Sequence, residues 1–337
     1  MRGGVAAEAA HNGSMRAESA RPPDTAPQIL ALGEAMIEFN AAGASDGLLY
    51  RQGFGGDTSN FAIAAARQGA RAGCLGALGD DANGRMLRAL WDAEGVDHND
   101  VRSDAAAYTA VYFVTHGAAG HEFSFFRQGS AASRMRPADL PRARIEAARV
   151  LHLSGITLAL SDSSCDAAHA AVDIARAAGV VVSFDTNLRL KLWPLARARA
   201  LIGDLIGRSD ICLPSLDDLQ QMTGSSDPDA LVDHCLRLGA RTVALKLGAA
   251  GALVADAHER HRIAPHRCRS VDATGAGDTF GGAFVARRLA GDGLRAAARY
   301  AAVAAALSTE GYGAVAPIPR ADAVWRALQQ DKEDGHG

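Results

Sequence analysis

The chain has 337 residues, of which 48% are hydrophobic and 22% are charged, and its formal net charge is −3. A chain of this length can bury one large hydrophobic core or two modest ones. Its body has no block of like charge and its apolar runs are shorter than a membrane span, which argues against a nucleic-acid groove, a membrane-surface helix and a transmembrane segment.

The first segment in chain order, residues 1–26, is small and polar and has no apolar stretch of the kind found in signal peptides. It predicts a disordered N-terminal extension. The five cysteines are scattered without a C-x-x-C pair, which favours reduced thiols over disulfides or a zinc site. Both features indicate a cytoplasmic protein.

Strands and helices begin to alternate at residue 28. The apolar run QILALGEAMIEF (28–39) predicts a strand, and TSNFAIAAARQGA (58–70) has apolar residues at helical spacing with a glycine stop. RAGCLGALG (71–79) predicts the next strand, and NGRMLRALWDAEG (83–95) predicts a helix closed by Gly95.

The rhythm then changes to β-structure. AYTAVYFVTHG (107–117) and HEFSFFRQG (121–129) are adjacent β runs joined by GAAG, a composition typical of a hairpin. The earlier run LLYRQGFGG (48–56) is short enough to pair with them. These runs predict a small β-sheet inserted into the domain, built from about residues 38–54 and 106–130.

Regular alternation returns after residue 149. The predicted strands and helices follow one another in the segments 149–155, 163–179, 180–187, 194–208, 210–214, 215–223, 228–239 and 241–248, then a short strand pair and two Ala-rich helices. This order predicts one α/β domain over residues 27–330, with a mostly parallel sheet covered by helices on both faces, and a flexible tail over 331–337. Ligands of such sheets bind at the carboxyl ends of the strands.

The segment DATGAGDTF (272–280) is the first candidate site. Gly275, Ala276 and Gly277 leave the backbone bare at a predicted helix start, where amide groups attract anions. Asp278 follows as a candidate general base for a bound hydroxyl. A tight turn capped by Asp is the plainer alternative. A dinucleotide fingerprint is disfavoured, because its third glycine is missing.

The segment GFGGDTSNFAIAAARQGA (53–70) is the second candidate site. Gly55 and Gly56 let the backbone approach a small molecule, while Asp57 and Asn60 offer side chains that suit sugar hydroxyls. An ordinary helix N-cap at Asp57 is the alternative, and it is compatible with a ligand role.

These two segments, in this order and at this separation, resemble the two signatures of the ribokinase-like (phosphofructokinase-B type) sugar kinases. The resemblance covers about residues 28–330. It implies an α/β domain with a β lid over the sugar, MgATP as the cofactor, Asp278 as the catalytic base and Gly275–Gly277 as the anion hole. It also leaves a monovalent cation open as a further cofactor.

Within that family, three stretches resemble the 2-keto-3-deoxygluconate kinases: LHLSGITLALS (151–161), FDTNLRLKLW (184–193) and GGDTSN (55–60). The second stretch places Asn187 among the expected substrate contacts. Arg127 and Arg189 stand at expected strand ends, and a planar guanidinium suits the carboxylate of a sugar acid. Solvated surface charge is the alternative interpretation for each arginine.

The lid departs from other members of that subgroup. Phe125 and Phe126 stand where some members have tyrosines, which leaves a stacking surface and removes a hydroxyl contact. Tyr112 matches the other lid tyrosine. Glu38 replaces the Asp with which many neutral-sugar kinases of the family grip hydroxyls, which indicates a different substrate.

The resemblance also assigns a nucleotide side. LPSLDDL (213–219) stands where the family has N-x-x-E, so Ser215 and Asp218 are the matching residues, and Asp218 could act on magnesium through water. No metal cage made only of protein groups is expected. The further nucleotide candidates are Lys246, Gly248 and Gly251 in LKLGAAGAL (245–253), and Asp272 and Thr274 in the second signature.

The sequence thus predicts an ATP-dependent kinase that phosphorylates a primary hydroxyl of 2-keto-3-deoxygluconate. Two alternatives stay open: a kinase of a neutral sugar such as fructose or ribose, and an inactive sugar-sensing protein. An NAD-linked oxidoreductase is disfavoured by the missing early fingerprint. The apolar lid strands predict a homodimer that forms through the lid.

Overall fold

The structure is a computed structural model that describes residues 26–41, 49–117 and 120–333. Most of the expected N-terminal extension, and residues 334–337 of the expected tail, lie outside the described residues. Residues 331–333 of that tail are helical, because α11 (Ala321–Glu333) runs through them. Two final helices were predicted, and α11 is a third that was not.

Within the described residues, nine strands form one sheet in the order β13-β12-β11-β10-β9-β8-β1-β4-β5. Neighbouring strands are parallel except β11–β12 and β12–β13, so the prediction of a mostly parallel sheet is confirmed. The strands are β1 (Ile29–Leu32), β4 (Ala72–Gly79), β5 (Val101–Asp104), β8 (Val150–Ser154), β9 (Val181–Asp185), β10 (Ile211–Cys212), β11 (Thr242–Lys246), β12 (Ala252–Ala255) and β13 (Arg260–Ile263).

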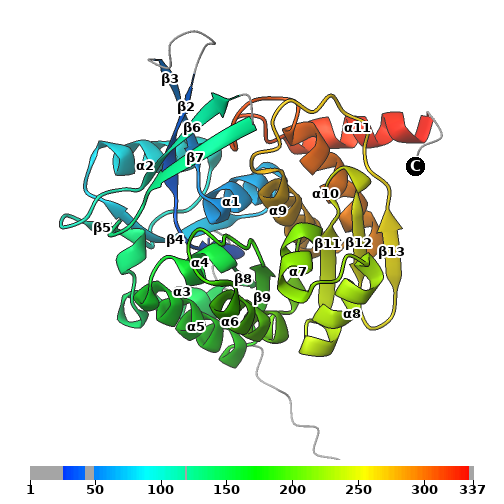
Figure 1. Ribbon diagram of the computed structural model, residues 1–337, viewed down its shortest axis with the longest axis horizontal. Helices are drawn as coiled ribbons and strands as arrows, with labels where there is room; N and C mark the ends of the chain where they lie inside the picture. The colour runs from blue at the N-terminus through cyan, green and yellow to red at the C-terminus, as the bar shows by residue number, and fades with distance from the viewer. Residues whose placement is uncertain (1–25, 42–48, 118–119, 334–337) are drawn as a thin grey trace, which may run out of the picture.

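Helices cover both faces of this sheet (Figure 1). One face is packed by α1 (Asp57–Arg67), α2 (Ala82–Glu94), α9 (Ala276–Leu289), α10 (Leu294–Ser308) and α11. The other face is packed by α3 (Arg142–Ala147), α4 (Gly155–Ala159), α5 (Asp162–Ala177), α6 (Leu195–Arg208), α7 (Leu216–Thr223) and α8 (Pro228–Leu238). None of these helices is both long and apolar enough to cross a membrane.

A separate four-stranded sheet, which we call the lid, stands at one side of the main sheet (Figure 1). Its order is β3-β2-β6-β7, with bounds β2 (Met36–Ala41), β3 (Tyr50–Gly55), β6 (Val111–Gly117) and β7 (Gly120–Phe126). The pairing is antiparallel except between β2 and β6. The predicted small β-sheet is therefore confirmed, and β3 pairs with β2 rather than with the 107–129 hairpin.

The predicted single strand over 28–39 is wrong, because this run divides between the two sheets. β1 pairs with β4 and β8 and ends at Leu32, and β2 begins at Met36 in the lid. The backbone N–H of Ile37 already donates to Ala110, which precedes lid strand β6. Both halves are apolar and buried, so hydrophobicity alone did not distinguish one long strand from two short ones.

Two helix ends follow local rules. Asp81 caps α2 by accepting a hydrogen bond from the Gly84 N–H at 2.7 Å, and Gly95 ends that helix in the left-handed conformation at φ 66°, as predicted. These caps direct α2 back across the sheet, so its buried Trp91 packs against α1.

His152 in β8 makes the stability of the fold depend on pH. Its buried ring stacks on Phe61 of α1 with 3.5 Å between centroids, and burial lowers the pKa of His152 to about 3. The unfolded chain, with a histidine pKa near 6.5, takes up this proton first. We expect the contribution of His152 to the free energy of unfolding to be complete above pH 6.5 and to be lost as the pH falls toward 3. Urea unfolding at several pH values measures this loss.

The variant His152→Phe keeps an aromatic ring at this position and removes the titration. We expect its free energy of unfolding to fall less steeply between pH 6.5 and 4.5, by up to about 1.4 kcal/mol per pH unit. Equal slopes for the variant and the parent protein would show that His152 is not the titrating group.

Candidate active site

The site lies where the carboxyl ends of β9 and β11 meet the first turns of α1, α7 and α9 (Figure 1). Parallel strands end at the same edge of a sheet, so polar residues that follow them gather there. The lid strand β3 leads directly into the first turn of α1 at this edge. Both sequence signatures meet here, although they are more than 200 residues apart in the chain.

The residues predicted as the anion hole, Gly275–Gly277, lie at the start of α9. Gly275 is the N-cap at φ 75°, and a Cβ on it would lie 2.9 Å from the Ala314 carbonyl oxygen, so glycine is required there. The Ala276 N–H donates to the Ala273 carbonyl at 3.2 Å. The first amides of a helix have no carbonyl partner within the helix, and they attract anions.

Asp278 lies in the same first turn and is half-buried. Its carboxylate accepts a hydrogen bond from Asn60 Nδ2 at 2.8 Å, which joins the two signatures directly. Loss of hydration on burial, and next the negative charge of Asp57, raise the pKa of Asp278 to about 8. A carboxyl group with this pKa is suited to take a proton near neutral pH.

The first turn of α1 presents the sugar-side candidates. The N-cap is Gly56 at φ 102°, and a Cβ there would lie 2.7 Å from Ala35 Cα. The alternative of Asp57 as an ordinary N-cap is therefore wrong. Its Oδ2 instead accepts a hydrogen bond from Asn187 Nδ2 at 2.8 Å. Asn60 Oδ1 is buried without a hydrogen-bond partner among the described residues, which leaves an acceptor for a ligand hydroxyl.

The lid candidates form one cluster. The Tyr112 hydroxyl donates to the buried Glu38 carboxylate, and burial raises the pKa of Glu38. A Cβ on Gly55 would lie 2.7 Å from the Tyr112 ring, so that ring fills the space beside Gly55. Phe125 stacks on Tyr112 at 5.6 Å and is 40% exposed.

The two arginine candidates have different surroundings. Arg127 is buried, and its guanidinium donates to the Glu34 carboxylate at 2.8 Å from Nε and 2.5 Å from Nη2. Ser130 donates to the other Glu34 oxygen at 2.8 Å. Arg189 is exposed, and its Nη1 donates to the Leu188 carbonyl. Arg127 therefore already has a carboxylate partner within the protein, whereas Arg189 stands at the surface.

The Glu34–Arg127 pair also fixes the base of the lid. Glu34 lies in the connection from β1 to β2, and Arg127 follows directly after β7. One buried ion pair thus joins two of the four connections of the lid, the one that enters β2 and the one that leaves β7. The sequence analysis did not single out Glu34.

The nucleotide-side candidates lie after β10, at and after the end of β11, and in the loop before α9. Ser215 caps α7 by accepting from the Asp218 N–H at 3.1 Å, and Asp218 accepts from the Thr186 hydroxyl at 2.8 Å. Lys246 forms an ion pair with Asp185, with 2.5 Å between Nζ and Oδ2. Gly248 and Gly251, both at positive φ, begin and follow a short 3-10 helix (Gly248–Ala250), and Asp272 accepts hydrogen bonds from Thr274 and Gly313.

The end of β9 carries two site residues, Asp185 and Thr186, to which no role was assigned from the sequence, next to the predicted substrate contact Asn187. Asp185, Thr186 and Asn187 follow one another at the end of β9, and their partners are Lys246, Asp218 and Asp57. A buried strand that ends in consecutive polar residues at the ligand edge was the available signal. No group of three or more His, Cys, Asp or Glu side chains suited to a metal ion occurs in the part of the chain described.

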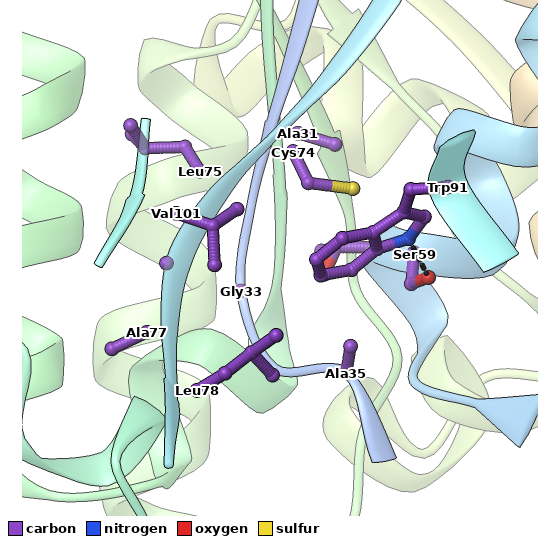
Figure 2. Close-up of a pocket in the computed structure, with 12 residues that line it drawn as sticks. Ala31, Gly33, Ala35, Ser59, Cys74, Leu75, Ala77, Leu78, Trp91 and Val101 are labelled. Carbon is purple, nitrogen blue, oxygen red and sulfur yellow. Dashed lines mark hydrogen bonds between the residues drawn. The ribbon is translucent and has the colours of Figure 1, made fainter. Parts of the chain in front are cut away.

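A separate pocket lies behind this site, between β1, β4, α1 and α2. Trp91 Nε1 donates to Ser59 Oγ at 2.9 Å, and Figure 2 shows Cys74 beside the indole ring. The residues that line this pocket include none of the candidates for catalysis or nucleotide binding. It is therefore a packing feature of the core rather than the substrate site.

Comparison with known proteins shows similarity over almost the whole chain. A profile of the family described as "pfkB family carbohydrate kinase" matches residues 26–321. A 2-dehydro-3-deoxygluconokinase of Thermoproteus tenax is 36% identical over 323 residues, 91% of this chain and 97% of the relative. Fructokinase-1 of Oryza sativa subsp. japonica is 35% identical over 307 residues, 86% of this chain and 94% of the relative.

Comparison with solved structures shows the same family likeness. A PfkB protein from Polaromonas sp. JS666 superposes with a TM-score of 0.81 at 33% identity, covering 90% of this chain and 100% of that one. A putative ribokinase II from E. coli, in complex with ATP and Mg²⁺, gives a TM-score of 0.84 at 25% identity, covering 90% of this chain and 99% of that one.

Proposed function

Because the chain belongs to the pfkB family of carbohydrate kinases, we propose that it transfers the terminal phosphoryl group of MgATP to a primary hydroxyl of 2-keto-3-deoxygluconate. The observation that carries this proposal is the contact between Asn60 and Asp278 at the start of α9. This contact supports the proposal because the candidate base, with its raised pKa, lies in the first turn of a helix, where free amides suit phosphate.

In the proposed reaction the sugar hydroxyl attacks the terminal phosphorus in line with the leaving ADP. The new bond joins the sugar oxygen to phosphorus, the bond to the ADP oxygen breaks, and the hydroxyl proton passes to Asp278. Amides at the start of α9 stabilise the charge on the phosphoryl oxygens. Asn60 orients Asp278, and Asp57, held by Asn187, contacts sugar hydroxyls.

Magnesium would enter with ATP, as in the E. coli structure that contains both. The buried Asp218 fits a water-mediated role, because it is an oxygen donor beside the phosphate side of the site. Thr186 fixes its orientation through a 2.8 Å hydrogen bond.

The choice of a sugar acid is supported by the similarity to the Thermoproteus tenax enzyme and by Arg189. Arg189 has an exposed guanidinium able to bind a carboxylate. A neutral ketohexose is the second candidate. It is favoured by the pairing of Arg127 with Glu34, which uses part of that guanidinium, and by the similarity to fructokinases.

A coupled ADP-release assay over 2-keto-3-deoxygluconate, its galactonate epimer, fructose, ribose and gluconate tests the proposal. We expect turnover with the keto acids. Turnover confined to fructose or ribose would retain the kinase and refute the carboxylate assignment. No turnover with any of these sugars would favour the sugar-sensing alternative.

The variant Arg189→Met isolates the carboxylate contact. We expect KM for the keto acid to rise about 10-fold or more while kcat changes little, because the lost contact binds the ground state and the transition state alike. Lys191→Met, at an exposed cation two residues away, is the matched control and should leave KM unchanged. An equal rise in both variants would indicate a general effect of surface charge.

We propose further that the enzyme is cytoplasmic and forms a homodimer through the lid. Tyr50, Phe125 and Phe126 of the lid are 40%, 40% and 57% exposed, and aromatic groups of this kind are common in interfaces. Light scattering on Phe126→Ser and the parent protein measures this association.

A further inference from the structure

We propose that Asp185 is a positioning residue for phosphoryl transfer, which holds the ammonium group of Lys246 beside Gly277 so that this cation neutralises charge on the phosphoryl group in transit. The inference rests on the proposed function and deepens it. It assigns a role to an aspartate that is contacted by a cation from another strand.

The geometry of the pair is that of a fixed cation. Asp185 ends β9 and Lys246 ends β11, so the ion pair crosses the end of the short strand β10 between them. Nζ lies 2.5 Å from Oδ2, and the two side chains are only 14% and 6% exposed. A Cβ on Gly277 would lie 3.4 Å from Nζ, so the ammonium stands at the predicted anion hole.

Lysine needs such a partner to act as a fixed charge. Its four-carbon stem is flexible, and ordering it costs side-chain entropy. Catalytic electrostatics depend on charges that are already in place before the reaction. An ammonium has three N–H donors, so a bond to Asp185 leaves two for phosphate oxygens.

The ion pair between Asp185 and Lys246 belongs to a larger hydrogen-bond network. Thr186 donates to Asp218 on the nucleotide side, and Asn187 donates to Asp57 on the sugar side. Among the described residues other than glycine, Asn187 alone has a positive φ, at 31°. The segment 185–187 thus connects the cation, the magnesium-side acid and the sugar-side acid through consecutive residues.

The charges that face one another here predict a pH signature. Burial raises the pKa of Asp278 most, Asp57 and Asp185 raise it further, and Lys246 lowers it. Burial raises the pKa of Asp185, Lys246 lowers it, and Asp218 and Asp57 raise it further. Removing Lys246 should therefore move the titration of Asp278 to higher pH, and removing the charge of Asp185 should move it to lower pH.

The test compares Lys246→Met, Asp185→Asn and the double variant. We expect kcat to fall about 10²-fold in Lys246→Met and about 10-fold in Asp185→Asn. The double variant should be no slower than Lys246→Met, because Asp185 acts through the lysine. Arg241→Met is the control: it removes an exposed cation next to the amino end of the same strand and should leave kcat unchanged.

Two further readouts separate positioning from a merely structural role. The acid limb of the profile of kcat/KM against pH should shift upward in Lys246→Met and downward in Asp185→Asn. Asp185→Asn should bind MgATP at least as tightly as the parent enzyme, since the freed ammonium loses its internal counter-charge. Thermal unfolding shows whether each variant is folded, and the double variant has no unpaired buried charge.

An unchanged kcat in Asp185→Asn would overturn the inference, and so would losses of kcat that multiply in the double variant. Weaker MgATP binding by Asp185→Asn together with a higher magnesium requirement would also overturn it, because Asp185 would then be a metal-side ligand. If the parent protein phosphorylates none of the sugars, the proposed function fails. Nucleotide binding then still tests the role of the Asp185–Lys246 pair. Lys246→Met should then weaken the binding of MgATP about 10-fold and that of MgADP little. Equal effects on both nucleotides would overturn the role given to the Asp185–Lys246 pair, independently of the proposed function.

Discussion

Replacing Asp278 by asparagine should lower kcat by about 10²-fold or more, with little change in the affinity for the sugar. The amide keeps the size of the side chain and its contact with Asn60, but it cannot accept the hydroxyl proton. Steady-state kinetics with saturating MgATP, together with direct measurement of sugar binding, checks both parts of this prediction. Near-normal turnover would remove Asp278 from the role of base.

The control for this variant is Asp217→Asn, which removes an exposed carboxylate from the first turn of α7. It should leave kcat unchanged.

In the parent enzyme, kcat/KM should decline about tenfold per pH unit below a pH near 8, because Asp278 must be ionised in the free enzyme to act. A profile that is flat from pH 6 to 8 would contradict the raised pKa.

Asp278→Asn should raise the stability of the fold although it lowers activity. The pKa of Asp278 is raised above its unfolded value of 3.8, so above about pH 4 the ionised group opposes folding. The neutral amide of Asp278→Asn does not repel Asp57, and the free energy of unfolding should increase. An enzyme that is slower and more stable would identify Asp278 as a residue kept for function at the expense of stability.

The second large effect is expected at the base of the lid. Replacing Glu34 by alanine should lower the free energy of unfolding by about 3–5 kcal/mol, because it leaves the buried guanidinium of Arg127 without its counter-charge. It also removes the acceptor for Ser130. Denaturant unfolding of the parent protein and the variant measures the difference.

The double variant Glu34→Ala/Arg127→Met should recover part of this loss, since no buried charge is left unpaired. Asp322→Ala breaks an exposed ion pair with Arg326 in α11, where both side chains are 66% exposed, and should leave the free energy of unfolding almost unchanged. Similar losses from Glu34→Ala and Asp322→Ala would show that the Glu34–Arg127 pair is not important for folding.

The sequence predicted those features that depend on short segments. Alternating strands and helices, the lid hairpin and the Gly95 helix stop are encoded by residues close together in the chain, because local geometry and exposure repeat along one element. DATGAGDTF likewise predicted a bare helix start that carries an acid, and α9 begins there.

The tertiary structure decided which residues of different elements meet. The contacts of Asn60 with Asp278, Glu34 with Arg127, and Asp185 with Lys246 join residues 218, 93 and 61 positions apart. No periodicity within a segment specifies such partners. The division of residues 28–39 between two sheets has the same origin, since both halves are apolar and only the packing of β1 and β2 in different sheets separates them. A local pattern determines which side of an element is buried, whereas topology determines what it is buried against.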